Sequence, residues 1–71
     1  LKGVMDKYYS VRELTEILSI PKSTIYRWVR EGSIPHYKIN GYIIRFKEKD
    51  IIKWLERYKK EEKRPEYLIL N

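Results

Sequence analysis

The stretch that decides the fold is PKSTIYRWVREG, residues 21–32. Ile25, Trp28 and Val29 stand at positions i, i+3 and i+4, which places them on one face of an α-helix. Pro21 is tolerated in the first turn of a helix, and Gly32 is well placed to end one because glycine readily adopts the left-handed conformation. The stretch therefore predicts a helix over about residues 21–31 with one buried face.

A shorter helix is predicted just before this one. Ser10 and Glu13 have the spacing of a capping box, in which each side chain accepts a hydrogen bond from the backbone of the other residue. An apolar face follows at helical spacing and predicts a helix over about residues 11–18; its members are Val11, Leu14, Ile17 and Leu18. Pro21 disfavours helical geometry in the residue before it and so separates the two helices. Two short helices joined by about three residues predict a helix-turn-helix.

A β-hairpin is predicted over about residues 36–46. Asn40-Gly41 lies between two β-prone runs, and both residues tolerate the positive φ of a two-residue type I′ turn. Such a turn pairs Ile39 with Tyr42 and thereby assigns every side chain to a face. The face expected to be apolar consists of Tyr37, Ile39, Tyr42, Ile44 and Phe46. The face expected to be largely basic consists of His36, Lys38, Ile43 and Arg45.

A third helix is predicted over about residues 48–60, and its expected buried stripe consists of Ile51, Trp54, Leu55 and Tyr58. Together these elements predict a mainly α fold with a small β-hairpin wing, a winged helix-turn-helix, over residues 1–64. Residues 65–71 form a C-terminal tail that contains the apolar run Tyr67 to Leu70. That run is consistent with an extra strand, a tail packed on the core, or the start of an interface.

Composition narrows the possible functions. The chain has 71 residues and a net charge of +6, and residues 21–47 hold six basic residues against one acidic residue. Such a basic stretch indicates a polyanionic partner.

The sequence also argues against several other classes of protein. There is no cysteine and a single histidine, His36, so we expect no disulfide, metal or cofactor. A chain this short has little room for a deep catalytic cavity, so we expect no enzyme. No apolar run is long enough for a membrane span and no signal peptide is evident, so we expect a cytoplasmic protein.

The outward face of the helix predicted over residues 21–31 is the candidate binding surface. With Ile25, Trp28 and Val29 inward, the side chains that point away from the core are Ser23, Arg27 and Arg30. The side chains that flank them are Lys22, Thr24 and Tyr26. Arginine can hold guanine O6 and N7 bidentately, whereas Ser, Thr, Tyr and Lys suit phosphate oxygens. Arg27 is central and is the best candidate for reading a base. Lys38 and Arg45 of the wing are expected to contact the DNA backbone or an adjacent minor groove.

The sequence resembles the excisionase-family DNA-binding domains, which are similar to the DNA-binding part of MerR-type regulators. The matching segments are YSVREL at residues 9–14, IPKSTIYRW at residues 20–28, REGSIP at residues 30–35, and Gly41 through Asp50-Ile51 to Trp54-Leu55, within a stretch of about 47 residues. The resemblance implies a winged helix-turn-helix whose second helix enters the major groove, and it implicates Ser23, Thr24, Tyr26 and Arg27, with wing contacts around Lys38 and Arg45. The chain departs from the family at Thr15, where alanine is usual, and at Ser19, where glycine is usual.

We therefore expect sequence-specific binding of double-stranded DNA, in the role of an excisionase-type or transcription-regulatory module or of the DNA-reading domain of a recombinase. Such roles imply the cytoplasm of a prokaryotic cell, or of the host of a phage or mobile element. The alternative is a protein-interaction or oligomerisation module that uses the apolar tail of residues 65–71 for self-association or for a partner protein.

Overall fold

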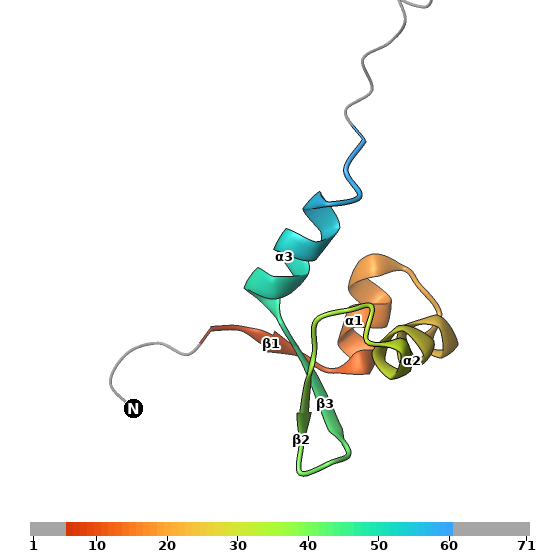
Figure 1. Cartoon of the computed structure of the whole chain (residues 1–71), viewed down its shortest axis with the longest axis vertical. Helices are drawn as coiled ribbons and strands as arrows, with labels where there is room; N and C mark the ends of the chain where they lie inside the picture. Colours follow the sequence, from red (N-terminus) through yellow and green to blue (C-terminus); the bar gives the residue numbers. More distant parts are fainter. Residues whose placement is uncertain (1–5, 61–71) are drawn as a thin grey trace, which may run out of the picture.

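The computed structural model describes residues 6–60, and the fold is the expected winged helix-turn-helix. Figure 1 shows two helices packed together beside a small sheet, with a third helix leading away from it. In chain order the elements are β1 (Tyr8–Tyr9), α1 (Val11–Leu18), α2 (Lys22–Glu31), β2 (Tyr37–Ile39), β3 (Ile43–Lys47) and α3 (Glu48–Glu56). The predicted tail, residues 65–71, lies outside the described residues.

The start of α1 is the predicted capping box. The backbone N–H of Glu13 donates to Ser10 Oγ at 3.1 Å, and the backbone N–H of Ser10 donates to Glu13 Oε1 at 2.9 Å. The pKa of Glu13 lies below its ordinary value, chiefly because of that backbone hydrogen bond. Helix α1 ends at Leu18, and its C-cap is Ser19, whose φ of 56° lies in the left-handed region where glycine is preferred.

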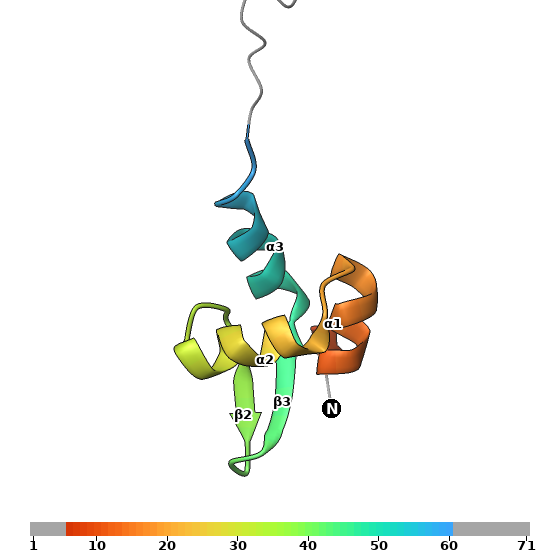
Figure 2. The same ribbon diagram turned by 90° about the vertical axis from the view of Figure 1, so that its right-hand side faces the viewer.

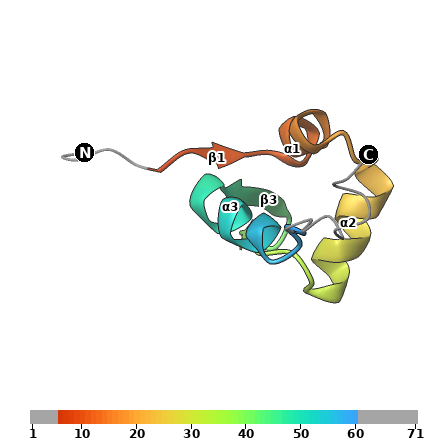
Figure 3. The ribbon, with the colours of Figure 1, turned by 90° about the horizontal axis from the view of Figure 1, so that it is seen from above.

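Helix α2 follows after a short turn and ends at Glu31, with Gly32 as its C-cap, as predicted. The φ of Gly32 is 71°, and its backbone N–H donates to the carbonyl oxygens of Trp28 and Val29. Figure 3, seen from above, shows α1 and α2 at the end of the molecule opposite to the N-terminal strand β1. The two helices thus form the helix-turn-helix unit.

The hairpin forms, but the predicted register is wrong. Asn40 and Gly41 adopt positive φ values of 52° and 81°, and the Tyr42 N–H donates to the Ile39 carbonyl oxygen at 3.2 Å, as a tight turn requires. The strand partner of Ile39, however, is Ile43. Tyr42 is therefore an extra residue on the β3 side of the turn, which is the arrangement of a β-bulge.

This shift of one residue exchanges the faces of β3. Tyr37 pairs with Arg45, and Lys38 pairs with Ile44. Because cross-strand partners share a face, Lys38 and Arg45 lie on opposite faces of the hairpin, and the prediction that they share one is wrong. A third strand that the sequence did not indicate, β1, pairs antiparallel with β3, so the sheet order is β1-β3-β2.

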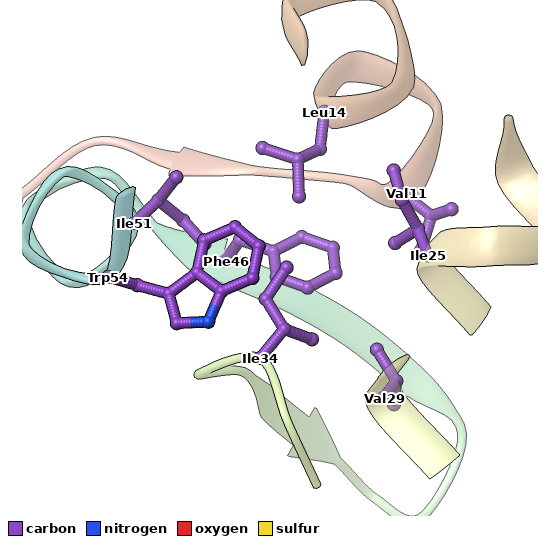
Figure 4. Close-up of a cluster of buried hydrophobic side chains, with 8 residues drawn as sticks. All are labelled: Val11, Leu14, Ile25, Val29, Ile34, Phe46, Ile51 and Trp54. Carbon is purple, nitrogen blue, oxygen red and sulfur yellow. The ribbon is translucent and has the colours of Figure 1, made fainter. Parts of the chain in front are cut away.

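The core lies between the helices and β3. Figure 4 shows the Phe46 ring at the centre of a cluster of eight buried side chains contributed by all three helices, β3 and the loop after α2. The cluster consists of Val11, Leu14, Ile25, Val29, Ile34, Phe46, Ile51 and Trp54. Trp28 packs against it and meets Trp54 edge to face, with ring centroids 5.6 Å apart. Both tryptophans therefore belong to the core, as their positions on the apolar helix faces predicted.

Some of the predicted helix faces are wider than the core that covers them. Ile17 of α1 is 55% exposed, and Leu55 and Tyr58 are exposed as well. The prediction that these three residues are buried is therefore wrong. Helix α3 also ends earlier than predicted, at Glu56 instead of Lys60. From Arg57 to Lys59 each backbone N–H donates to the carbonyl three residues earlier, a tighter pattern that is frequent at helix ends.

Candidate nucleic-acid interface

Helix α2 presents the predicted side chains to solvent. Ile25 is fully buried and Val29 nearly so, and this fixes the rotation of the helix about its axis. Five of the predicted α2 residues are exposed and one is half-buried; the exposed ones are Lys22, Ser23, Tyr26, Arg27 and Arg30, and the half-buried one is Thr24. The structure therefore gathers the six side chains on the outer side of one helix.

The cations of this face are available to a partner. Within residues 6–60 the ion pairs are those of Asp6 with Lys47 and Lys49, and neither involves α2. In addition, the N-terminus of α2 has no side-chain cap, because Pro21 occupies the capping position. The backbone N–H groups of Thr24 and Ile25 donate to the carbonyl oxygen of Pro21, at 3.1 and 3.2 Å, and the start of α2, beside Lys22, carries the positive end of the helix dipole.

The wing residues go in different directions. Lys38 is exposed on β2, which is an edge strand of the sheet. Arg45 is half-buried, and its Nη1 donates to the carbonyl oxygen of Ile44 at 2.8 Å. The structure brings Arg45 together with Lys22 and Tyr26 at one cavity and leaves Lys38 apart from them.

That cavity, which we call the notch, is an open hollow of about 360 Å³ between the starts of α1 and α2 and the wing. Its walls carry three cations and two phenols, which are Arg12, Lys22, Arg45, Tyr26 and Tyr42. Figure 2 shows α2 lying across the base of the β2–β3 hairpin, with α1 beside it.

Two of these residues, Arg12 and Tyr42, were missed from the sequence. Arg12 lies in a stretch with balanced charge, and its only local signal is that it follows the buried Val11 in the first turn of α1. Tyr42 was assigned to the apolar face of the hairpin because the two-residue turn paired it with Ile39. In the structure it is 76% exposed.

Two basic side chains at the other end of β3, Lys47 and Lys49, share one acidic partner. Lys47 and Lys49 each place their ammonium nitrogen 3.2 Å from a carboxylate oxygen of Asp6. The hydrogen bond from Lys49, followed by that from Lys47, holds the pKa of Asp6 below its ordinary value, and the bond to Asp6 raises the pKa of Lys47. Nearby, the Tyr9 hydroxyl donates to Glu48, and this bond raises the pKa of Tyr9. This region is a structural joint between β1 and α3.

A separate apolar groove of about 440 Å³ lies where α2 meets α3. It is lined by Ile20, Trp28, Leu55 and Tyr58, among others. Across residues 6–60 no three histidine or acidic side chains are grouped as a metal site requires. In the same residues no helix is long and apolar enough to cross a membrane.

A comparison with protein families matches residues 8–59 to a helix-turn-helix domain family. Neither the curated proteins nor the solved structures contain a match. The matched segment includes every described strand and helix, from β1 to α3. The chain therefore belongs to this excisionase-like helix-turn-helix domain family.

Proposed function

We propose that the chain binds double-stranded DNA sequence-specifically, with α2 in the major groove. The observation that carries this proposal is the outer face of α2, where Lys22, Arg27 and Arg30 are exposed and take part in none of the ion pairs of residues 6–60. Membership of a helix-turn-helix family supports it, because such domains present their second helix to DNA. A helix about 10–12 Å across also matches a major groove about 12 Å wide.

Within this proposal the side chains of α2 divide into two roles. Arg27 lies in the middle of the exposed face and is assigned to a base, because its guanidinium matches O6 and N7 of guanine. Arg30, one turn later, contacts either a base or the backbone. The remaining side chains suit phosphate oxygens, and they are Lys22, Ser23, Thr24 and Tyr26.

The wing is assigned to the DNA backbone or an adjacent minor groove. Since Lys38 and Arg45 lie on opposite faces of the hairpin, they meet different parts of the DNA. Arg45 acts with the start of α2, whereas Lys38 acts alone from the edge strand.

The biological role that we propose is that of an excisionase-type or transcription-regulatory module, or of the DNA-reading domain of a recombinase. The excisionase-like family supports this group of roles. Such a domain acts without a catalytic residue or a cofactor, in the cytoplasm of a prokaryotic cell or of a cell that hosts a phage or mobile element. We assign residues 1–64 to this domain.

Salt dependence of DNA binding tests the proposal. The logarithm of the association constant for a 20-base-pair duplex should fall linearly with the logarithm of salt concentration. The expected slope is about −4, because each neutralised phosphate contributes about −0.9 and four or five contacts are expected from the basic residues of α2 and the wing. A single strand of the same sequence should bind more weakly. A flat salt response, or a preference for the single strand, would contradict the proposal.

A second candidate function is protein interaction or self-association through residues 65–71. The apolar groove between α2 and α3 favours it, because Leu55 and Tyr58, at and just after the C-terminal end of α3, expose apolar surface there. Sedimentation of the chain with and without residues 65–71 tests this function. An unchanged mass, together with unchanged cooperativity on DNA, removes it.

A further inference from the structure

The notch combines the features of a seat for a single phosphate group. We propose that it holds one phosphodiester of the DNA backbone, and that Arg12 and Tyr42 are therefore DNA-binding residues. This inference rests on the proposed DNA binding and adds to it a specific anchor, built from α1, α2 and the wing together.

The charge of the notch suits an anion. Three of the residues that line the notch are cationic, Arg12, Lys22 and Arg45. No acidic residue lines it. Glu13 is near enough for Arg45 to lower its pKa, but the main cause of that lowered pKa is the Ser10 backbone N–H. The Glu13 carboxylate is thus held in the capping box, where it accepts that N–H at 2.9 Å.

The donors of the notch are carried by three parts of the fold, the first turn of α1, the start of α2 and the wing. The capping box fixes the first turn of α1, which carries Arg12. Arg45 uses Nη1 to bond the Ile44 carbonyl oxygen, and a guanidinium has five N–H donors, so most of its donors are left for a ligand. Tyr42 reaches the notch because it is the extra residue of the turn. The fold thus brings these donors to one place before a ligand binds, and binding has to order only their side chains.

The position of the notch identifies the anion as backbone phosphate. It opens beside Lys22 at the start of α2, and Arg27 lies a little more than one turn further along the same helix. When α2 lies in the major groove, the phosphates that border the groove pass the start of the helix. A phosphate held there fixes the position of α2 in the groove and so decides which base Arg27 meets.

The first experiment compares three variants on a 20-base-pair duplex of arbitrary sequence and on a duplex recovered by selection. Arg12→Gln should weaken binding to both by a similar factor, about threefold to tenfold, as expected for the loss of one polar contact. It should also reduce the magnitude of the salt slope by about 0.9, because one phosphate is no longer neutralised. Arg12→Lys keeps the charge and should keep the slope. Arg57→Gln, the same change at an exposed arginine after α3, should alter neither quantity.

The second experiment uses the unaltered protein, so it does not depend on how a variant folds. Single phosphates of the selected duplex are replaced one at a time by uncharged methylphosphonate. One position should weaken binding of the unaltered protein severalfold and should have little further effect on Arg12→Gln, because both changes remove the same contact.

The outcomes separate the two proposals. An unchanged slope for Arg12→Gln, or additive effects at every phosphate, would overturn the notch as a phosphate seat while salt-dependent duplex binding still supports the proposed function. Absence of duplex binding by the unaltered chain would overturn both.

Discussion

Helices α2 and α3 are built on the same plan but carry opposite charge on their outer faces. Each buries an apolar stripe and contributes one tryptophan to the edge-to-face pair between them. Helix α2 has three basic residues and one acidic residue, whereas α3 has two basic and three acidic residues. The apolar pattern therefore specifies the fold at both helices, and only the outer charge distinguishes the candidate DNA-binding helix from the supporting one.

The largest effect is expected from a substitution in the core on which both helices pack. Phe46 is fully buried at the centre of the core, so Phe46→Ala should lower the free energy of unfolding by about 3–5 kcal/mol. Urea denaturation followed by tryptophan fluorescence would measure it. Ile52→Ala, at a half-exposed position of α3, is the control and should change stability far less. Equal effects of the two substitutions would show that the core is not centred on Phe46.

The next largest effect is expected on DNA binding when positive charges are removed from α2 instead of α3. The double variant Arg27→Ala/Arg30→Ala should lose at least about 2 kcal/mol of duplex binding, because each DNA contact of this kind contributes about 1–3 kcal/mol. The matched variant Lys49→Ala/Lys53→Ala removes the same number of charges from α3 and should lose much less. Similar losses, measured by fluorescence anisotropy at one stated salt concentration, would mean that only net charge matters.

A smaller effect is expected at the joint between the helices. Trp54 Nε1 donates to the carbonyl oxygen of Ser33, just after α2, at 2.9 Å. Trp54→Phe leaves that carbonyl without this donor and should lower the free energy of unfolding by about 1–2 kcal/mol. Ser33→Ala keeps the carbonyl oxygen and should lower the free energy of unfolding by less than half as much. Thermal unfolding of both variants would measure the two effects. An effect of Trp54→Phe no larger than that of Ser33→Ala would rule out a stabilising role for this hydrogen bond.

The smallest effect is a loss of stability in acid at the joint between β1 and α3. The pKa of Asp6 is lowered by Lys49 and Lys47, so its contribution is present above the pKa of the unfolded chain and is lost as the pH falls through the folded value. The loss should therefore occur below about pH 4. Asp6→Asn should be less stable than the unaltered chain at pH 7 and closer to it at pH 3. A constant difference between the two proteins across this range would contradict the ion pairs.

These features also show what the sequence could predict. The capping box, the spacing of Ile25 and Val29, and the stop at Gly32 are local signals, and the structure confirms them. At Ser19, where glycine is usual in the family that the sequence resembles, the φ of 56° is one that glycine adopts most readily. At Thr15, the other departure from the family, the hydroxyl is buried without a hydrogen-bond partner in the described part of the chain.

The features that were missed depend on contacts between distant residues. Strand β1 pairs Tyr8 with Lys47, which no local pattern reveals. The register of the hairpin depends on one extra residue, Tyr42, and the Asn40-Gly41 turn signal does not show whether such a residue is present. For the same reason the notch could not be predicted, since its residues come from three separate segments. The periodic residues Ile17 and Leu55 remained exposed because the small core does not reach them.

The most direct test of the account is a selection from random duplexes with the unaltered chain and Arg27→Ala in parallel, at the same salt concentration. The unaltered chain should enrich one motif. Arg27→Ala should lose preference at one or two adjacent positions, most simply a guanine, while the rest of the motif persists. An unchanged motif after removal of Arg27, or no enrichment by the unaltered chain, would contradict the assignment of α2 as the helix that reads DNA.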